Sequence, residues 1–526
     1  MAVIKTKASG EAQPSIISDP AVSVKKSYVI NRTIPANFLG ITAQYWPIGP
    51  TAQNPNVLPY KWTRSITAKV VDGTGTYELQ WRNLHWKAAS ISWSGTTVTV
   101  ELDITYQASY LFSTGDKVVI AGSSSPGINS AGGAAHYTIT KINSTSFTYT
   151  GTTSGTGSAS TGSIFSVFYI SKFDDWVNTH KANNTDIAYT LFGTPQFAAL
   201  NPFEANPGWP GYLGGVSPHT DIGAGAIQAF VAMLWQRYFG KIQFIEVWNE
   251  PQYGAGGAVE GNYYTGTPTN LSDMCRIVKQ TLLTNSATMQ VISPPPASAS
   301  KLGTIQQILS ANFGNYGPIG TYQAKSQQVT SAPTTASTVL NFTTTQNLHA
   351  TTSVGLHVFG AGIPDGTTLV SFVSNTSITV SVPVTVGASV TVSVGGGIDY
   401  VDIIGVHSYH THFTGDIFDQ IIAIKNWLTA VGESSLPIYS TECGYLDAYT
   451  GIKTDKEWLD NVAYILRSSV LAGCDKVMLY AWDDLVLKVN DRPAVNAALA
   501  SVINAITGKT YTSVQVDAQN KKLTVI

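Results

Sequence analysis

Between about residue 180 and residue 507, the chain alternates short apolar runs with amphipathic stretches of helical spacing. A run such as 187–192 is typical of a buried strand, and a stretch such as 227–235 is typical of a helix. Strands that alternate with helices in this way indicate a parallel sheet, and this many repeats predict an α/β fold, an eight-stranded (β/α)8 TIM barrel. The expected strands are 37–43, 60–66, 187–192, 242–247, 289–293, 400–407, 436–442 and 475–482, and the expected helices lie near 172–183, 227–235, 270–286, 301–312, 416–431, 455–472 and 493–507.

Two stretches, near 87–163 and 321–397, interrupt this alternation. Both are rich in Ser, Thr, Gly and Val, with short alternating β-runs and no helical period. The two stretches also contain similar short segments in the same order. Residues 115–120, 126–128 and 143–148 in the first correspond to 355–359, 362–364 and 374–379 in the second. The pattern predicts two copies of one small β-rich module inserted into the barrel, and two unrelated β-rich loops are the alternative.

These features predict a division of the chain into barrel and insert segments. The first insert follows the second strand, so we expect it on the face where the strands end, which carries the active site in such barrels. The second insert follows a helix and precedes a strand, so we expect it on the opposite face. The expected parts are the first part of the barrel at 1–86, insert 1 at 87–163, the middle of the barrel at 164–320, insert 2 at 321–397, and the last part of the barrel with a C-terminal β-hairpin at 398–526.

Composition excludes several classes of protein. The 526 residues are 43% apolar, which favours a folded chain, and only 12% are charged, with a net charge of −2. The chain has no stripe of basic residues that would suggest a nucleic-acid partner. The chain contains no run of 18 apolar residues, so a membrane span is not expected. Cys275, Cys443 and Cys474 show neither metal-ligand nor disulfide spacing and are expected as buried thiols.

Two glutamates stand at the ends of expected strands. Glu250 lies in the run Trp248-Asn249-Glu250-Pro251-Gln252, directly after the fourth strand, and Glu442 ends the seventh. In a barrel, the C-terminal ends of all strands converge on one rim, so these two carboxyl groups can meet. Hydrolysis of a glycosidic bond with retention needs one protonated and one ionised carboxyl group about 5–5.5 Å apart. The pair therefore predicts a glycosidase, whereas Asn-Glu-Pro alone could be an ordinary turn.

The string 246–251 on strand four, together with Thr441-Glu442-Cys443-Gly444 on strand seven, resembles the clan A retaining glycoside hydrolases, most of all family 39 and its relatives. The resemblance covers the barrel segments and not the two inserts. It implies that Glu250 is the general acid/base and Glu442 the nucleophile. It also implies that Asn249 binds the sugar 2-hydroxyl.

The same resemblance implies further contacts at the strand ends. His407 and Tyr409, two residues apart on strand six, share one face; the histidine would contact the sugar and the tyrosine the nucleophile. Trp482 would form an aromatic platform beneath the sugar. Arg64 would contact Glu442 and keep its pKa low. Packing roles are the alternative for His407, Tyr409 and Trp482, and an ordinary salt bridge is the alternative for Arg64. Residues on expected strand-to-helix loops could line the binding subsites: Gln44, Trp46, Trp209 and Tyr253.

A metal cluster of His407, His410 and His412 is a rival interpretation, but no acidic or fourth ligand shares their spacing. We expect neither a metal nor another cofactor. The sequence therefore predicts a retaining glycosidase that acts by double displacement on a polysaccharide or oligosaccharide. A β linkage is what the clan implies, and a bacterial exopolysaccharide is one candidate substrate. A non-catalytic carbohydrate-binding surface or virion protein and a transglycosylase are the alternatives.

Location and assembly are less constrained by the sequence. Residues 1–7 lack the apolar core of a secretory signal peptide, so a signal has been removed or the protein leaves the cell without one. The inserts look like the Gly- and Thr-rich repeats of phage tail and bacterial surface proteins. We therefore expect an extracellular or virion-associated protein, for which a phage depolymerase is one form. The oligomeric state is left open.

Overall fold

The computed structural model describes residues 25–42, 45–46, 60–66, 68–72, 75–105, 107–123, 125, 127–131, 135–159, 166–203, 221–253, 263–285, 287–311, 327–343, 354–374, 376–409, 416–444, 454–480, 493–517 and 522–526. Among these residues, no helix is long and apolar enough to cross a membrane. The three cysteines are buried free thiols, as the sequence predicts.

Eight strands form one parallel sheet whose order around the sheet is β17-β16-β15-β4-β2-β26-β25-β24. A parallel bridge between Ile292 and Ile403 links the two ends of this order, so the sheet curls into a nearly closed barrel of the TIM type. The strands are β2 (Leu39–Thr42), β4 (Trp62–Arg64), β15 (Asp186–Leu191), β16 (Phe244–Val247), β17 (Gln290–Ile292), β24 (Ile404–Tyr409), β25 (Ile438–Gly444) and β26 (Cys474–Tyr480).

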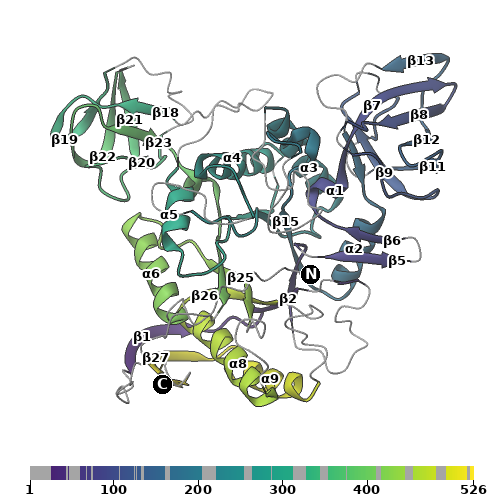
Figure 1. The fold of residues 1–526 in the computed structure, drawn as a ribbon. Coiled ribbons are helices and arrows are strands. Elements are labelled where there is room, and N and C mark those ends of the chain that lie inside the picture. Colours follow the sequence, from purple (N-terminus) through teal and green to yellow (C-terminus); the bar gives the residue numbers. More distant parts are fainter. Residues whose placement is uncertain are drawn as a thin grey trace, which may run out of the picture.

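Helices follow most of these strands, as expected for a (β/α)8 chain, and surround the barrel (Figure 1). They are α2 (Ser171–Ala182), α3 (Asp221–Arg237), α4 (Pro268–Thr284), α5 (Leu302–Leu309), α6 (Ile417–Ala430), α8 (Asp455–Ala472) and α9 (Pro493–Ile506). Capping is visible at α8, where Thr454 and Glu457 form a reciprocal capping box. Every expected helix is present, with ends that differ by a few residues.

One expected strand begins later than the sequence suggests. Residues 400–403 belong to the expected strand 400–407, but Gly397–Tyr400 forms a 3-10 turn and β24 starts only at Ile404. The Asp399 carboxylate accepts a hydrogen bond from the Gly396 amide at 2.9 Å, which stabilises the turn over the extended chain.

The interior of the barrel, on the side where its strands begin, is filled by one side chain from each of seven neighbouring barrel segments. Trp62 and Phe244 belong to this cluster, and Arg64 and Glu246 follow them by two residues on the same strands. Because residues two apart in a strand face the same side, the next layer towards the strand ends is charged. The cluster is Trp62, Ala188, Phe244, Ile292, Ile403, Tyr439 and Met478.

The strands from His85 to Tyr169 form an antiparallel sheet with the order β10-β9-β14-β7-β8-β12-β11, and β13 also pairs with β7. This sheet lies at the upper right in Figure 1. The strands are β7 (His85–Ser94), β8 (Thr97–Leu102), β9 (Lys117–Ala121), β10 (Tyr137–Thr138), β11 (Thr140–Lys141), β12 (Ser146–Thr150), β13 (Thr156–Ala159) and β14 (Ser166–Tyr169).

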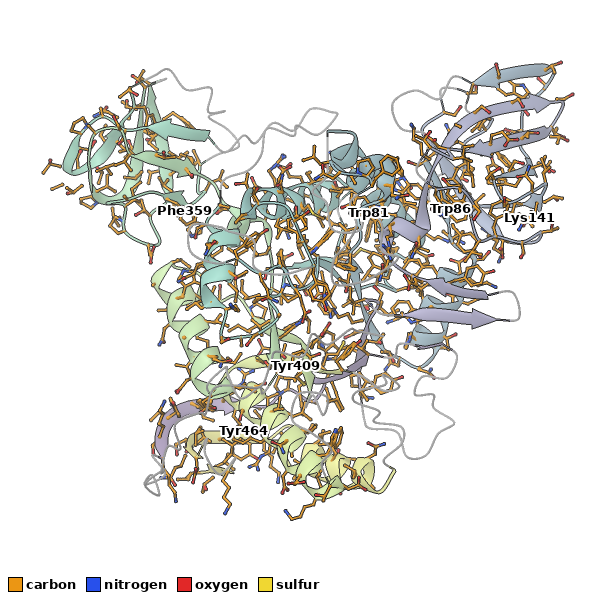
Figure 2. The ribbon with its side chains drawn as sticks, viewed as in Figure 1. Trp81, Trp86, Lys141, Phe359, Tyr409 and Tyr464 are labelled. Carbon is orange, nitrogen blue, oxygen red and sulfur yellow. The ribbon has the colours of Figure 1, made fainter. Side chains whose placement is uncertain are left out.

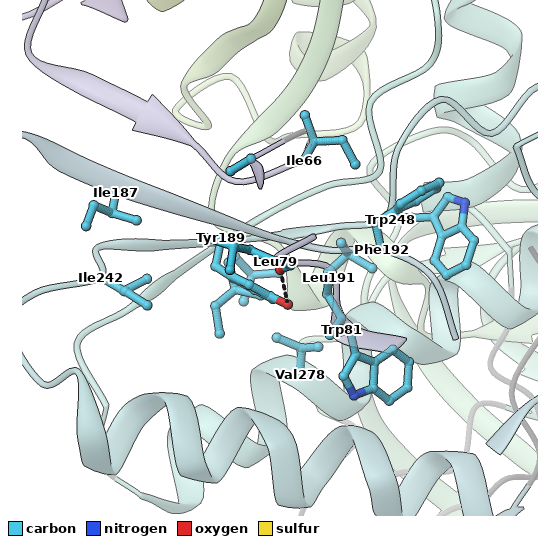
Figure 3. Packing of buried hydrophobic residues seen from close by; sticks show 14 of the residues in the cluster. Ile66, Leu79, Trp81, Ile187, Tyr189, Leu191, Phe192, Ile242, Trp248 and Val278 are labelled. Carbon is cyan, nitrogen blue, oxygen red and sulfur yellow. Dashed lines mark hydrogen bonds between the residues drawn. The ribbon is translucent and has the colours of Figure 1, made fainter. Parts of the chain in front are cut away.

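This sheet shares one continuous hydrophobic core with the barrel. The His85 ring packs 4.5 Å from Phe168 within the sheet and 6.0 Å from Phe230 of α3. The short helix α1 (Trp81–Leu84) joins the sheet to the end of β15, where the Trp81 amide donates to the Phe192 carbonyl. Nearby, the Tyr189 hydroxyl donates to the Leu79 carbonyl at 3.2 Å (Figure 3).

The strands between α5 and β24 form two three-stranded antiparallel sheets, β18-β23-β20 and β19-β22-β21, at the upper left of Figure 1. They enclose a hydrophobic core of their own, separate from that of the barrel. The strands are β18 (Gln327–Thr330), β19 (Thr334–Asn341), β20 (Val358–Phe359), β21 (Leu369–Ser374), β22 (Ser377–Val386) and β23 (Thr391–Val394).

Polar contacts tether this second set of strands to the barrel. The His357 ring bonds to the Asp399 carboxylate at 2.7 Å and to the Val431 carbonyl at 3.1 Å. Val431 follows α6 and precedes β25, so this contact lies at the face where the barrel strands begin. In Figure 2, Phe359 lies in this set, Trp86 and Lys141 lie in the other, and Tyr409 lies in the barrel between them.

The two sets of strands share part of their order. The neighbours β9-β14-β7 correspond to β20-β23-β18, and β8-β12-β11 correspond to β19-β22-β21. Both contain a glycine of positive φ before the corresponding strand, Gly115 at 96° and Gly355 at 90°. The amide of Gly115 donates to the Ile139 carbonyl, and that of Gly355 donates to the Leu369 carbonyl.

Two smaller sheets complete the described fold. The C-terminal hairpin of β27 (Thr510–Asp517) and β28 (Lys522–Val525) is present, and β1 (Lys26–Thr33) adds to it as a third strand. The strands β3 (Tyr45–Trp46), β5 (Lys69–Asp72) and β6 (Gly75–Glu78) form a sheet that the sequence analysis did not anticipate.

Candidate active site

Four barrel strands bring charged and polar side chains together at their C-terminal ends. Arg64 is the last residue of β4, and His407 and Tyr409 lie near the end of β24. Glu442 lies near the end of β25, and the Asn249-Glu250 pair follows β16 directly. The register pairs His407 with Glu442 on adjacent strands. Residues far apart in the chain thus form one site, at the position that the sequence predicts for it.

The backbone at the end of β16 is in an unusual conformation. Trp248 and Glu250, on either side of Asn249, have φ of 66° and 49°, in the left-handed region that non-glycine residues rarely adopt. Each such residue costs of order 1–3 kcal/mol and persists only when its surroundings hold it. The Glu250 amide donates to the Pro295 carbonyl at 3.0 Å, and the Trp248 indole donates to the Tyr263 carbonyl at 2.9 Å. These contacts hold Trp248 and Glu250, the two residues that flank Asn249.

Glu442 is held from two sides. The Arg64 guanidinium donates from Nη1 to one carboxylate oxygen, and the Tyr409 hydroxyl donates to the other at 2.8 Å. Its side chain is only 8% exposed. Charge-assisted hydrogen bonds of this kind favour the ionised carboxylate and fix its orientation.

Glu250 has a different environment. Its carboxyl group is 14% exposed and makes a hydrogen bond of 2.8 Å to Nδ1 of His407. Burial raises the pKa of Glu250 to about 7, with a smaller opposing effect from Arg64. A carboxyl group with this pKa holds a proton at neutral pH more readily than an ordinary glutamate, which suits a general acid.

Arg64 does not keep the pKa of Glu442 below its ordinary value, contrary to the expectation from the resemblance. Burial raises the pKa of Glu442, and this effect outweighs the opposing effects of His407, Arg64 and Tyr409. The neighbouring carboxyl group of Glu250 adds to the rise. The physical reason is that desolvation of the charged form acts on every buried carboxylate, whether or not a cation lies beside it.

His407 also differs from its expected role. The resemblance implies a sugar contact, but the His407 side chain is fully buried between the two carboxyl groups. Its Nδ1 lies 2.8 Å from an oxygen of Glu250 and 3.6 Å from one of Glu442. Burial lowers the pKa of His407 to about 4, so the ring is neutral at neutral pH. Its position suits the orientation of Glu250 better than a contact with a substrate.

Asn249 is oriented by Arg64. The Nη2 group of Arg64 donates to Oδ1 of Asn249 at 2.7 Å. With its oxygen engaged in this way, the amide NH2 group of Asn249 is the end that can donate to a substrate hydroxyl. Asn249 is almost buried, at 6% exposure, so this orientation is well defined.

Sequence reasoning missed two residues of this network. Glu246 in β16 is fully buried and accepts a hydrogen bond of 2.5 Å from Nε of Arg64. Thr190 in β15 donates to the same carboxylate oxygen at 2.8 Å. One signal was available for Glu246, because a charged residue inside an apolar strand is unusual unless it is paired. Thr190 offered no such signal.

Gln44, Trp482, Trp209, His410 and His412 lie outside the described residues, and so does the side chain of Trp46. Tyr253 is described and is 3% exposed, with its hydroxyl donating to the Gly266 carbonyl. Its burial argues against the expected role in lining a binding subsite.

The site has some capacity for a cation. Glu250, His407 and Glu442 each offer a ligand atom, and these atoms all lie within 4.8 Å of one another. However, Arg64 already pairs with Glu442, and its guanidinium would repel a second positive charge nearby. The arrangement therefore suits a pair of carboxyl groups that act in acid–base chemistry better than a set of metal ligands.

A scan against models of protein families finds no match for this chain, and a search of curated proteins finds none either. Solved structures do show similarity. A glucosidase from Croceicoccus marinus is 11% identical with a TM-score of 0.36, and the alignment covers 66% of this chain and 56% of that one. A monomeric beta-xylosidase from Caulobacter crescentus is 14% identical with a TM-score of 0.38, covering 66% and 58%.

A family 39 glycoside hydrolase from Bacteroides cellulosilyticus is 11% identical with a TM-score of 0.36, covering 65% of this chain and 60% of that one. This chain thus spans less than two thirds of the length of each of the three structures. They include the family that the sequence motifs resemble. With identities and TM-scores this low, the geometry of the site has to support a function by itself.

Proposed function

We propose that this protein is a retaining glycoside hydrolase. One observation carries the proposal: Glu250 and Glu442 stand at the ends of two barrel strands with carboxylate oxygens within 4.8 Å of each other. An oxygen-to-oxygen distance within this limit is compatible with the separation of about 5–5.5 Å between carboxyl groups that is typical of retaining enzymes. The two carboxyl groups also have different partners, since Glu250 bonds to His407, whereas Glu442 accepts hydrogen bonds from Arg64 and Tyr409.

In the first step, Glu442 attacks the anomeric carbon and forms a covalent glycosyl ester. Arg64 and Tyr409 hold its two oxygens, so one is directed to the sugar with little loss of conformational freedom. Glu250 transfers its proton to the departing glycosidic oxygen at the same time. Asn249 donates from its amide to the sugar 2-hydroxyl, a contact that strengthens at the transition state.

In the second step, Glu250 is ionised and serves as the base. It removes a proton from a water that attacks the anomeric carbon, and the bond to Glu442 breaks with the configuration retained. The hydrogen bond from Glu250 to His407 keeps the carboxyl group in place while its charge changes. His407 is neutral, so it adds no competing charge.

We further propose that the substrate is a polysaccharide or oligosaccharide with a β linkage, with a bacterial exopolysaccharide as one candidate, and that the protein works outside the cell or on a virion. The low charged fraction of 12% supports this location. The partial strand order shared between the β-strands of 85–169 and those of 327–394 supports their origin as two copies of one module. Release of new reducing ends from a panel of exopolysaccharides would identify the substrate, and no release from any of them would contradict this choice.

Two substitutions test the mechanism on an activated aryl β-glycoside. Glu442→Gln removes the nucleophile, so we expect turnover to fall by at least about 10⁴-fold. Glu250→Ala removes the acid and base, so hydrolysis of the activated substrate should slow at deglycosylation, and azide should restore the rate and form a glycosyl azide of retained configuration. Proton NMR of the first product formed by the wild type should show the β-anomer.

Circular dichroism of both variants controls for loss of the fold. Near-normal rates in folded Glu442→Gln and Glu250→Ala proteins would refute the assignment. Treatment of the wild type with a chelator tests the alternative use of the site by a metal. A rate that falls with the chelator and returns with a divalent cation would favour that alternative.

A further inference from the structure

Glu246 is a buried acidic side chain beneath the proposed catalytic pair. It lies in β16, four residues before Glu250, and its side chain is fully buried. Its register neighbours on the adjacent strands are Thr190 and Ile292, neither of which is charged. An ionised carboxylate in such a place is strongly unfavourable unless a cation and hydrogen bonds compensate for its lost hydration.

Arg64 provides that compensation and connects Glu246 to the site. The Nε group of Arg64 donates to Glu246 at 2.5 Å, Nη1 donates to Glu442, and Nη2 donates to Asn249 at 2.7 Å. The guanidinium is planar and rigid, so fixing its Nε edge determines where both terminal nitrogens point. Thr190 donates to the same oxygen of Glu246 at 2.8 Å and holds that carboxylate in turn.

The charges of this group matter as much as its geometry. Arg64 carries one positive charge and contacts two carboxylates, Glu246 and Glu442. Glu246 therefore offsets the guanidinium charge that Glu442 would otherwise experience in a site with little water. A carboxylate beside an uncompensated cation is a weaker base and a weaker nucleophile.

We propose that Glu246 is a positioning residue of this site: it holds Arg64 in the orientation that engages both Glu442 and Asn249, and it offsets the Arg64 charge on Glu442. The inference rests on the proposed glycosidase function for its kinetic consequences, but its structural part concerns charge and geometry that exist without a substrate.

Other ionisable groups face Glu442 and enter any account of its titration. Glu250 follows β16, His407 and Tyr409 lie on β24, and Tyr480 ends β26 next to Tyr409. His407 also experiences the charges of Glu246 and Arg64. His407 also loses the charge of Glu246 on substitution, so its own titration is followed alongside that of Glu442. A shift of Glu442 while His407 stays neutral is then ascribed to Glu246 and Arg64.

Carboxyl titration measured by NMR with ¹³C-labelled glutamate tests the charge effect without any substrate. The signals of Glu250 and Glu442 are assigned from their Gln variants. Glu246→Gln keeps the side-chain shape and removes one negative charge, so the ionised forms of Glu442 and Glu250 gain stability. Both titrations should therefore move to lower pH. Unchanged titration of Glu442 in folded Glu246→Gln protein would overturn the proposal.

Glu246→Asp tests the position of the carboxylate separately from its charge. It also provides a test of the proposal if the Glu246→Gln protein does not fold. It keeps the negative charge, but its shorter side chain cannot hold Nε of Arg64 at the same point. We expect kcat on an aryl glycoside to fall by about 10- to 100-fold, while both limbs of the pH–rate profile stay where they are in the wild type. Wild-type kcat in this variant would refute the positioning role.

A matched control removes a carboxylate from another arginine pair. Asp174 on α2 accepts two hydrogen bonds from Arg237 on α3, outside the barrel interior. Asp174→Asn should leave the pH–rate limbs and the Glu442 titration unchanged. If the wild type shows no glycosidase activity at all, the proposed function fails, whereas the NMR titration still decides whether Glu246 sets the charge state of Glu442.

Discussion

Glu250 and Glu442 are the same residue type, and their neighbours make them different. Glu250 bonds to a neutral histidine, whereas Glu442 bonds to a guanidinium and a phenol. Glu250 has a pKa of about 7 and so keeps its proton up to neutral pH. Glu442 accepts hydrogen bonds from two donors that favour its ionised form. Division of labour between two carboxyl groups by environment is a general pattern in glycosidases.

This difference predicts an alkaline limit to activity. We expect kcat/KM to fall as pH rises through about 7, because Glu250 loses the proton that it must donate. Stopped assays across pH 4–10 with an aryl glycoside measure this limb. In Glu250→Ala with a leaving group that needs no protonation, the limb should vanish. Its persistence at the same pH would assign the limb to another group.

The same residue predicts a gain of stability on substitution. The pKa of Glu250 is raised in the folded state, so its contribution to stability is fully present below pH 4.5 and is lost as pH rises through about 7. Glu250→Gln has no such loss. Above pH 8 it should be more stable than the wild type by on the order of 3 kcal/mol, and at pH 4 the two should agree. Urea denaturation at both values measures the difference, and equal stability at pH 8 would contradict the raised pKa.

At the scale of the element, strand β2 approaches its neighbour β4 closely enough to require glycine. A Cβ at Gly40 would lie 2.5 Å from the Trp62 indole nitrogen, and Trp62 fills the barrel interior on the side where its strands begin. The indole is held there by a hydrogen bond to the Phe38 carbonyl at 3.1 Å, so it has little freedom to move. The close approach of these two strands thus depends on the absence of a side chain at Gly40.

Gly40→Ala should therefore destabilise the protein by roughly 1–3 kcal/mol through overpacking. Thermal and urea unfolding of the variant measure this loss. The matched control is Gly303→Ala in α5, where an added Cβ meets nothing within 4 Å. That substitution should be neutral or stabilise by up to about 1 kcal/mol, because alanine favours a helix over glycine. Equal stability of the two variants would show that the Trp62 side chain can move to accommodate the added methyl group.

At the scale of the whole molecule, the two added sets of strands relate differently to the barrel. The sheet of 85–169 contributes Val98, Val100 and Phe147 to the same hydrophobic core as the barrel helices. The sheets of 327–394 enclose a separate core, and their described polar contacts reach the face where the barrel strands begin. One set is therefore part of the folding unit of the barrel, and the other is attached to it.

Removal of each set should have opposite consequences. Deletion of 321–397 with a short linker should preserve the fold and leave turnover of a small aryl glycoside within about twofold of wild type, because no residue of the described site lies there. Deletion of 87–163 should give an unfolded or insoluble protein, because it removes Tyr110 and Phe112, which pack on Trp86, and exposes the apolar core that the sheet shares with the barrel. Solubility, circular dichroism and rate measure both. A folded but inactive first deletion would show that the second set of strands contributes to the site.

Much of the fold follows from local pattern. The strands 242–247 and 436–442 were recognisable because each is a short apolar run that ends at polar residues, and α8 was recognisable from the helical spacing of 455–472. What local pattern could not reveal is the pairing of short segments that bury little by themselves. The β3-β5-β6 sheet and the addition of β1 to the C-terminal hairpin were missed for that reason.

The sequence by itself determined the barrel, the rim on which its strands end, and the presence of Glu250 and Glu442 there, because periodicity and strand polarity are local properties. Only the tertiary structure decided which groups surround those carboxyls. It buried His407, raised the pKa of Glu442 despite Arg64, and placed Glu246 behind that arginine. Desolvation and charge depend on atoms from β4, β16, β24 and β25 that meet only in the folded barrel.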